Sequence, residues 1–292
     1  MNRKLDWETE GRDWPNRAAS RFVDSGDLRW HVQVMGDGPA LVLLHGTGAA
    51  THSWRTLAPL LAQTHTVVAP DLPGHGFTSA PHDGAGFTLP AVAQAVSALL
   101  AALDIAPLAM IGHSAGAAIG ARMLLDGALA PSGLIGLNAA LLPFPGPLGP
   151  WAPTLARLFF YNPFSLGLFA QRAAHPGAIA SLMRSTGSTL DAEGLGLYER
   201  LFRNKAHLEG TVALMAHWDL YALKRDLVHL RVPLTLIAGD ADRAVSPDTA
   251  FEVQRLAQHA HVIVAPGLGH LAHEENPALI AEMIQSALQH GR

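Results

Sequence analysis

The sequence predicts an α/β fold in which a mostly parallel central sheet carries helices on both faces. Short apolar runs alternate with segments of helical periodicity along most of the 292 residues, which is the pattern of repeated strand–helix units. Some runs, such as residues 40–44, are continuously apolar, as expected for strands that are covered on both faces. The chain is also long enough to bury one large core that carries an insertion.

In the first half of the chain, strands and helices can be placed in order. The polar segment 1–19, which contains Trp7 and Trp14, is expected to be an arm lying on the domain. Strand signals begin at Arg21. The predicted strands span residues 28–34, 40–44, 66–69 and 107–111. The predicted helices span residues 54–63, with Ser53 as N-cap, and residues 89–103.

The second half of the chain changes character after Asn138. A helix over 117–125 and a strand over 134–137 come first. Arg157 is then the only charged residue between Gly127 and Gln171, and residues 140–226 are expected to be irregular and helical. The later predicted elements are a strand at 232–238, a helix from Pro247 capped by Ser246, a strand at 262–265 and a helix from about 276. We therefore predict a core of residues 1–139 and 227–292, with residues 140–226 forming a cap inserted after about the sixth strand.

Composition excludes several classes of function. The net charge of −4 and the lack of a Lys/Arg cluster give no basis for binding nucleic acid. The absence of cysteine excludes disulfides, thiolate metal sites and a cysteine nucleophile. The histidines lack a metal-ligand spacing, and no dinucleotide or phosphate-loop motif is present, so we expect neither a metal nor a cofactor. The charged amino terminus and the lack of a membrane-spanning apolar stretch predict a cytoplasmic protein.

The motif that points to chemistry is Gly112-His-Ser-Ala-Gly116. It lies between a predicted strand and a predicted helix, where a sharp turn forces the serine into a strained conformation and exposes its hydroxyl. The glycines are needed because strand and helix pass too close there for a Cβ atom. Ser114 is therefore the candidate nucleophile. The neighbouring His113 is expected to point into the fold and to be structural.

A serine hydroxyl needs a general base, and that base needs an acid to orient it. Both should follow later strands, because such groups gather at the carboxyl ends of the strands in an α/β sheet. His270 follows the last predicted strand and is the candidate base, with His273 as the alternative, expected to be exposed near a helix start. Asp242 is the candidate acid, and Asp240 is the alternative. An aspartate at such a place can also be an ordinary turn residue.

An oxyanion hole would need two backbone donors. The amide of Ala115 is one candidate because it follows the nucleophile at a helix amino terminus. The amide of Thr47 is the other, within His45-Gly-Thr-Gly48 directly after the strand at 40–44. That tetrapeptide could also be an ordinary turn at the end of a strand.

Together these residues resemble the α/β-hydrolase superfamily, from about Arg21 to Leu137 and from Val232 to the end of the chain. The turn Asp71-Leu-Pro-Gly-His-Gly76 also matches a turn that is common in that superfamily, where it is mostly structural. The resemblance implies an α/β-hydrolase fold with a Ser-His-Asp triad. Because the nucleophile is serine, relatives that use aspartate for dehalogenation or epoxide opening fit less well.

A narrower resemblance covers roughly the first 120 residues. Five segments support it: Asp13-Trp-Pro-Asn-Arg17, Trp30-His-Val-Gln33, Leu44–Arg55, Asp71–Thr78 and the Ser114 motif. They resemble the corresponding segments of a family of magnesium-chelatase accessory proteins of bacteriochlorophyll biosynthesis. This resemblance implies a tetrapyrrole pathway and magnesium chelatase as a partner. It does not identify a reaction.

The leading hypothesis is a serine hydrolase acting on an apolar carboxylic ester, for which a tetrapyrrole ester is one candidate. Four cap aromatics could line an apolar pocket, or could form the core of the cap: Trp151, Phe159, Phe160 and Tyr161. The alternative is a non-catalytic accessory protein that binds a tetrapyrrole for the chelatase, with His207 or His217 approaching the macrocycle. At most a peripheral membrane contact through residues 141–170 is expected.

Overall fold

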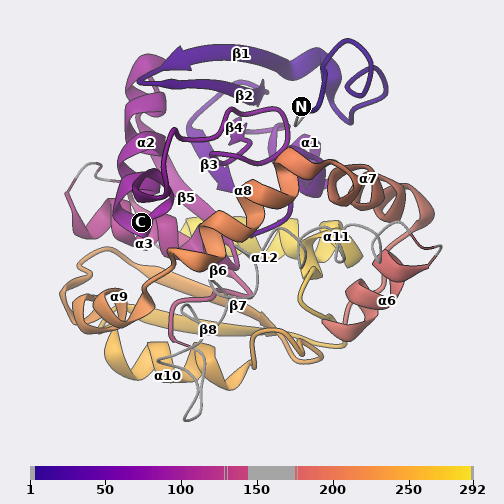
Figure 1. The fold of residues 1–292 in the computed structure, drawn as a ribbon. Coiled ribbons are helices and arrows are strands. Elements are labelled where there is room, and N and C mark those ends of the chain that lie inside the picture. The colour runs from indigo at the N-terminus through magenta and orange to yellow at the C-terminus, as the bar shows by residue number, and fades with distance from the viewer. Residues whose placement is uncertain (1–3, 128, 130, 144–174, 176, 291–292) are drawn as a thin grey trace.

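The computed structural model describes residues 4–127, 129, 131–143, 175 and 177–290, and an eight-stranded sheet forms its centre (Figure 1). The strand order is β1-β2-β4-β3-β5-β6-β7-β8. The strands are β1 (Ser20–Ser25), β2 (Leu28–Met35), β3 (Ala40–Leu44), β4 (Thr66–Pro70), β5 (Pro107–His113), β6 (Gly133–Leu137), β7 (Leu234–Gly239) and β8 (Ala260–Ala265).

The sheet is antiparallel at one end and parallel elsewhere. Strand β2 pairs antiparallel with β1 and with β4, whereas every pair from β4–β3 to β7–β8 is parallel. The prediction of a mostly parallel sheet is therefore confirmed. Parallel pairing brings the carboxyl ends of β3, β5, β7 and β8 to one edge, where the predicted site residues follow them.

The continuously apolar strands are covered on both faces because alternate side chains point to opposite sides. Val42 and Leu44 lie in one core cluster, and Leu41 and Leu43 lie in another. The first cluster includes residues of α2 (Leu89–Ala102), α3 (Ala115–Leu125), α9 (Leu220–Asp226) and α10 (Asp248–Leu256). The second includes residues of α1 (Leu57–Leu61), α11 (Ala272–Glu275) and α12 (Pro277–His290).

Between β6 and β7 the chain forms further helices, which we call the cap helices: α6 (Ala178–Ser185), α7 (Ala192–Arg203), α8 (Lys205–Ala216) and α9. Figure 1 shows α8 running across the middle of the molecule, between the β1 end and the β8 end of the sheet. The exact core and cap boundaries at 139/140 and 226/227 stay a prediction. Residues 144–174, including Trp151, Phe159, Phe160 and Tyr161, lie outside the described residues.

The amino-terminal segment lies on the domain, as predicted, and contacts the cap. Leu5 and Trp14 are buried against Leu197 and Leu201 of α7. Arg200 of α7 reaches both carboxylate oxygens of Asp13 at 2.7 Å. The amino-terminal segment therefore links cap helix α7 to the core.

Some local predictions were wrong. Ser53 lies within a 3₁₀ helix (Thr51–Trp54), and α1 begins at Leu57 with Thr56 at its N-cap position. The Ser53 hydroxyl instead donates to Glu274 Oε1 at 2.8 Å, so a tertiary contact replaces the capping bond. Elsewhere in the described part of the chain, short 3₁₀ helices span Arg17–Ala19, Gly84–Phe87 and Leu227–His229. Among the helices of the described part, none has the length and apolar character needed to cross a bilayer.

Candidate active site

Ser114 sits in the sharp turn that the sequence predicts between β5 and α3. Its φ of 50° and ψ of −115° lie in a region that non-glycine residues rarely occupy, which costs about 1–3 kcal/mol. A Cβ at Gly116 would lie 2.0 Å from the carbonyl oxygen of Leu44. Helix α3 therefore starts against the end of β3, and the serine side chain makes no capping bond to that helix.

Asp242 and His270 are brought together from two neighbouring strands. Oδ2 of Asp242 lies 2.8 Å from Nδ1 of His270. The other carboxylate oxygen, Oδ1, accepts the amides of Ala244 at 2.7 Å and Val245 at 2.9 Å. A carboxylate held in this way fixes the ring so that Nδ1 carries the proton and Nε2 is free to accept one.

The charge of Asp242 is favoured although its side chain is fully buried. Burial alone would raise the pKa of this carboxyl. The hydrogen bond from His270, the attraction of that ring and the hydrogen bonds from Val245 and Asn138 outweigh burial, so the pKa lies below its ordinary value. Asp242 is thus ionised at neutral pH.

The alternative acid and base lie elsewhere. Asp240 accepts the amide of Gly267 at 2.6 Å and is exposed, as a turn residue would be. His273 is buried, with Nε2 2.7 Å from Ser53 Oγ, so the expectation that it is exposed was wrong. It lies near a helix start, as expected, because α11 begins at Ala272, but its ring packs inward against Trp54.

His113 lies behind the candidate base and points into the fold, as predicted. Its Nε2 donates to the backbone oxygen of His270 at 2.9 Å. Its ring lies between those of His270 and His273, with centroids 4.8 and 4.5 Å away. Burial lowers the pKa of His113 to about 3, so this ring is neutral and supports the His270 loop.

The loop that contains Thr47 lies directly against the serine turn. A Cβ at Gly46 would come within 2.7 Å of His113 Nδ1 and within 3.1 Å of Ser114 Cβ. His45 is buried under this loop, where its Nε2 accepts the Leu72 amide at 2.9 Å and its Nδ1 donates to Gly46 O at 2.8 Å. Because the peptide is planar, the bond to Gly46 O also directs the Thr47 N–H.

Neither of the two candidate donor amides, Thr47 and Ala115, donates a hydrogen bond within the part of the chain that the structure describes. Ala115 begins α3, where the first amides have no partner within the helix. Both groups are therefore open to an acceptor. Between the described residues the Ser114 hydroxyl and His270 do not form a hydrogen bond, and in enzymes without substrate this contact is often long.

Asn138 belongs to this site, although sequence reasoning did not find it. It directly follows β6, and its Nδ2 donates to Asp242 Oδ2 at 2.6 Å and to Gly269 O at 3.3 Å. Its φ of 46° is one that asparagine tolerates better than most residues. A polar residue directly after a buried strand next to the serine strand was the signal that could have revealed it.

The cap is tied to both loops that carry Asp242 and His270. The amide of Arg243 donates to Thr186 O at 3.0 Å, and the amide of Leu271 donates to Ser188 Oγ at 2.8 Å. Ser188 is fully buried. The connection between α6 and α7 therefore holds the residues next to the candidate acid and base.

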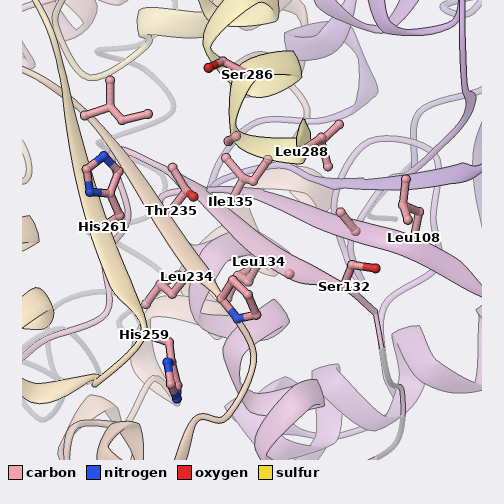
Figure 2. A pocket seen from close by; sticks show the side chains of 15 residues that line it. Leu108, Ser132, Leu134, Ile135, Leu234, Thr235, His259, His261, Ser286 and Leu288 are labelled. Carbon is pink, nitrogen blue, oxygen red and sulfur yellow. The ribbon is translucent and has the colours of Figure 1, made fainter. Parts of the chain in front are cut away.

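A cavity of about 440 Å³ lies at the other edge of the sheet (Figure 2). It is lined by residues at the amino ends of β5–β8 and by α12, including Leu108, Ser132, Leu234, His259 and Ser286. The candidate triad follows the carboxyl ends of the strands, so this cavity is not its substrate pocket. No group of three or more histidine and acidic side chains suited to a metal occurs among the described residues.

Comparison with known proteins places this chain in a family. Residues 39–277 match the family model of the alpha/beta hydrolase fold. The chain belongs to the α/β-hydrolase superfamily. The predicted resemblance to that superfamily is thereby confirmed. A candidate lipase of Acinetobacter baumannii superimposes on this chain with a TM-score of 0.80 at 20% identity, covering 100% of this chain and 98% of the other. The epoxide hydrolase CorEH gives 0.77 at 21% identity, covering 94% and 99%. Structures this distant support the fold alone.

A sequence relative supports the narrower resemblance. The magnesium-chelatase 30 kDa subunit of Rhodobacter capsulatus is 37% identical over 264 residues, which cover 90% of this chain and 92% of that protein. The similarity therefore extends through the cap, where the sequence motifs alone were uninformative.

Proposed function

We propose that this α/β-hydrolase is a serine hydrolase that cleaves an apolar carboxylic ester through Ser114, His270 and Asp242. The observation that supports it is the pairing of a strained Ser114 turn with a His270–Asp242 contact of 2.8 Å at the same sheet edge. A serine held in a strained turn and an oriented imidazole are the two components that acyl transfer needs.

In the proposed reaction the Ser114 hydroxyl attacks the ester carbonyl while Nε2 of His270 takes its proton. The resulting oxyanion accepts hydrogen bonds from the amides of Thr47 and Ala115. His270 then gives the proton to the leaving alcohol, and an acyl-enzyme forms on Ser114. Water, deprotonated by His270, then attacks the acyl-enzyme, and His270 returns that proton to the Ser114 oxygen as the carboxylic acid leaves. Asp242 stabilises the imidazolium in both halves of the reaction.

A fluorophosphonate probe tests the nucleophile. Wild-type protein should be labelled at Ser114, and folded Ser114→Ala should not be labelled. A panel of p-nitrophenyl esters with increasing acyl length then tests the substrate class, for which we expect a preference for longer or bulkier groups. Wild-type protein that is folded but neither labels nor turns over any ester would rule out the proposal.

A second candidate function is that of a tetrapyrrole-binding accessory protein for magnesium chelatase, favoured by the name of the 37% identical relative. His207 would not face the macrocycle in that role, because both of its ring nitrogens are hydrogen-bonded inside the fold. Incubation with tetrapyrrole carboxyl esters separates the two functions. A mass loss that requires Ser114 supports the esterase, whereas binding that is unchanged in Ser114→Ala and without a mass change supports the accessory protein.

A further inference from the structure

His207 connects cap helix α8 to two loops of the core. Its Nε2 lies 3.1 Å from Gly48 O, in the loop that carries Thr47. Its Nδ1 accepts the amide of Gly76 at 3.0 Å, in the turn after β4. The ring is buried, so water cannot replace either bond.

The two bonds assign one tautomer to the ring. An amide N–H can only donate, so Nδ1 of His207 carries no proton. The proton is then on Nε2, which donates to the Gly48 carbonyl. Burial lowers the pKa of His207 to about 4, which agrees with a neutral ring at physiological pH.

Backbone packing holds α8 against the same two loops. A Cβ at Gly210 would lie 2.1 Å from Gly74 O, so the helix rests on the turn after β4 at backbone contact distance. Gly48 has a φ of +79°, and a Cβ there would lie 3.2 Å from Phe202 of α7. The cap helices thus leave the Thr47 loop little room to move away from Ser114.

The carbonyls on either side of Thr47 are held by two different histidines. His45, from the core, donates to Gly46 O, and His207, from the cap, donates to Gly48 O. The Thr47 amide lies between these fixed points. Its direction therefore depends on the cap as well as on the core.

We propose that His207 is a positioning residue that holds the Thr47 amide in place as an oxyanion donor. The rate of the reaction then depends on how α8 packs against the loop that carries Thr47. This inference rests on the proposed function. It assigns to the cap a part in transition-state stabilisation, separate from any part in binding the substrate.

Three substitutions separate the two bonds. His207→Leu removes both. His207→Asn keeps an acceptor near the Nδ1 position for Gly76 but has no donor that reaches Gly48. His207→Gln extends an amide toward Gly48 and restores that donor. His229→Leu, at an exposed histidine of the 3₁₀ helix after α9, is the matched control.

The first readout is chemical. Loss of an oxyanion donor slows catalysis about 10²–10³-fold, and a displaced donor should cost less. We expect kcat and the rate of fluorophosphonate labelling to fall about 10- to 100-fold in His207→Leu and His207→Asn, with KM changed less than about threefold. His207→Gln should recover most of the rate, and His229→Leu should keep all of it.

The second readout does not depend on activity. Hydrogen–deuterium exchange should accelerate in peptides that cover residues 45–50 in His207→Leu and His207→Asn, and not in His207→Gln or the control. Normal exchange and normal labelling in a folded His207→Asn would overturn the inference, as would equal losses in His207→Asn and His207→Gln. If wild-type protein shows no labelling, the proposed function fails, and the exchange data still decide whether His207 holds the loop.

Discussion

Asn138 Nδ2 lies 2.6 Å from Oδ2 of Asp242, the same oxygen that lies 2.8 Å from Nδ1 of His270. The candidate acid is therefore oriented by the strand that lies between the serine strand and its own, since β6 separates β5 from β7 in the sheet. This contact makes Asn138 part of the arrangement that fixes the imidazole.

Asn138→Gly should slow the proposed reaction without unfolding the protein. Glycine accepts the positive φ of this position, so the substitution removes the side-chain amide alone. Hydrogen bonds to a charged group contribute about 1.5–3 kcal/mol, and we expect kcat on an ester substrate to fall about 10- to 100-fold. Asn16→Gly is the control, because Asn16 also has a positive φ of 55° but donates to Arg55 O away from the triad. Equal kcat in the two variants would contradict the role of Asn138.

Gly116→Ala should destabilise the fold strongly. The added Cβ would lie 2.0 Å from Leu44 O and 2.6 Å from Leu44 C, which are backbone atoms that cannot rotate away. We expect a loss of about 3 kcal/mol or more, or failure to fold. Gly196→Ala is the matched control within α7, where a Cβ meets nothing within 4 Å, and it should gain about 0.5–1 kcal/mol. Urea unfolding measures both, and similar midpoints would show that α3 can move away from β3.

These residues also show what local sequence could predict. The strand–serine–helix turn and the order of acid and base follow from patterns within a few residues of each site. The partners of Ser53, Asn138 and His273 instead come from segments far along the chain. Ser53 has the residue type of a helix cap, but its hydroxyl bonds Glu274, 221 residues away. Such contacts depend on which strands become neighbours, and local periodicity does not contain that information.

Glu274→Leu should be one of the more costly substitutions. The Glu274 carboxylate is fully buried and accepts Tyr198 Oη and Ser53 Oγ, each at 2.8 Å, and Arg55 Nη1 at 2.5 Å. Among the described residues, removing it leaves the mostly buried Arg55 guanidinium with exposed Asp191 as its remaining ion-pair partner. Breaking a buried pair from one side costs about 3–5 kcal/mol.

The control for that prediction is Glu252→Leu, which removes the half-exposed pair with Lys224 at 2.8 Å and should cost less than about 1 kcal/mol. Thermal and urea unfolding of both variants provide the comparison. If Glu274→Leu lost no more unfolding free energy than the control, the contacts of Glu274 with Tyr198, Ser53 and Arg55 would add little to the attachment of the cap to the core.

Acid should destabilise the protein below about pH 6.5, because several histidines are buried in neutral form. Burial lowers the pKa of His207 to about 4 and that of His113 to about 3, and it also lowers the pKa values of His45, His52, His75 and His273. In the unfolded chain such rings take up protons near pH 6.5. Between pH 6.5 and 4 the unfolded state therefore binds more protons, so the free energy of unfolding falls as pH falls.

One ring's share of that slope can be measured by substituting it. Each histidine that stays neutral only when folded adds up to about 1.4 kcal/mol per pH unit. Glu274 works in the opposite direction, because burial raises the pKa of its carboxyl, but it adds at most one proton. Urea unfolding from pH 4.5 to 7 should therefore give a slope in His207→Gln that is smaller than in wild type by up to about 1.4 kcal/mol per pH unit. Parallel slopes in the two proteins would mean that His207 binds its proton equally well in the folded and unfolded states, against the buried geometry in which Nδ1 accepts the Gly76 amide.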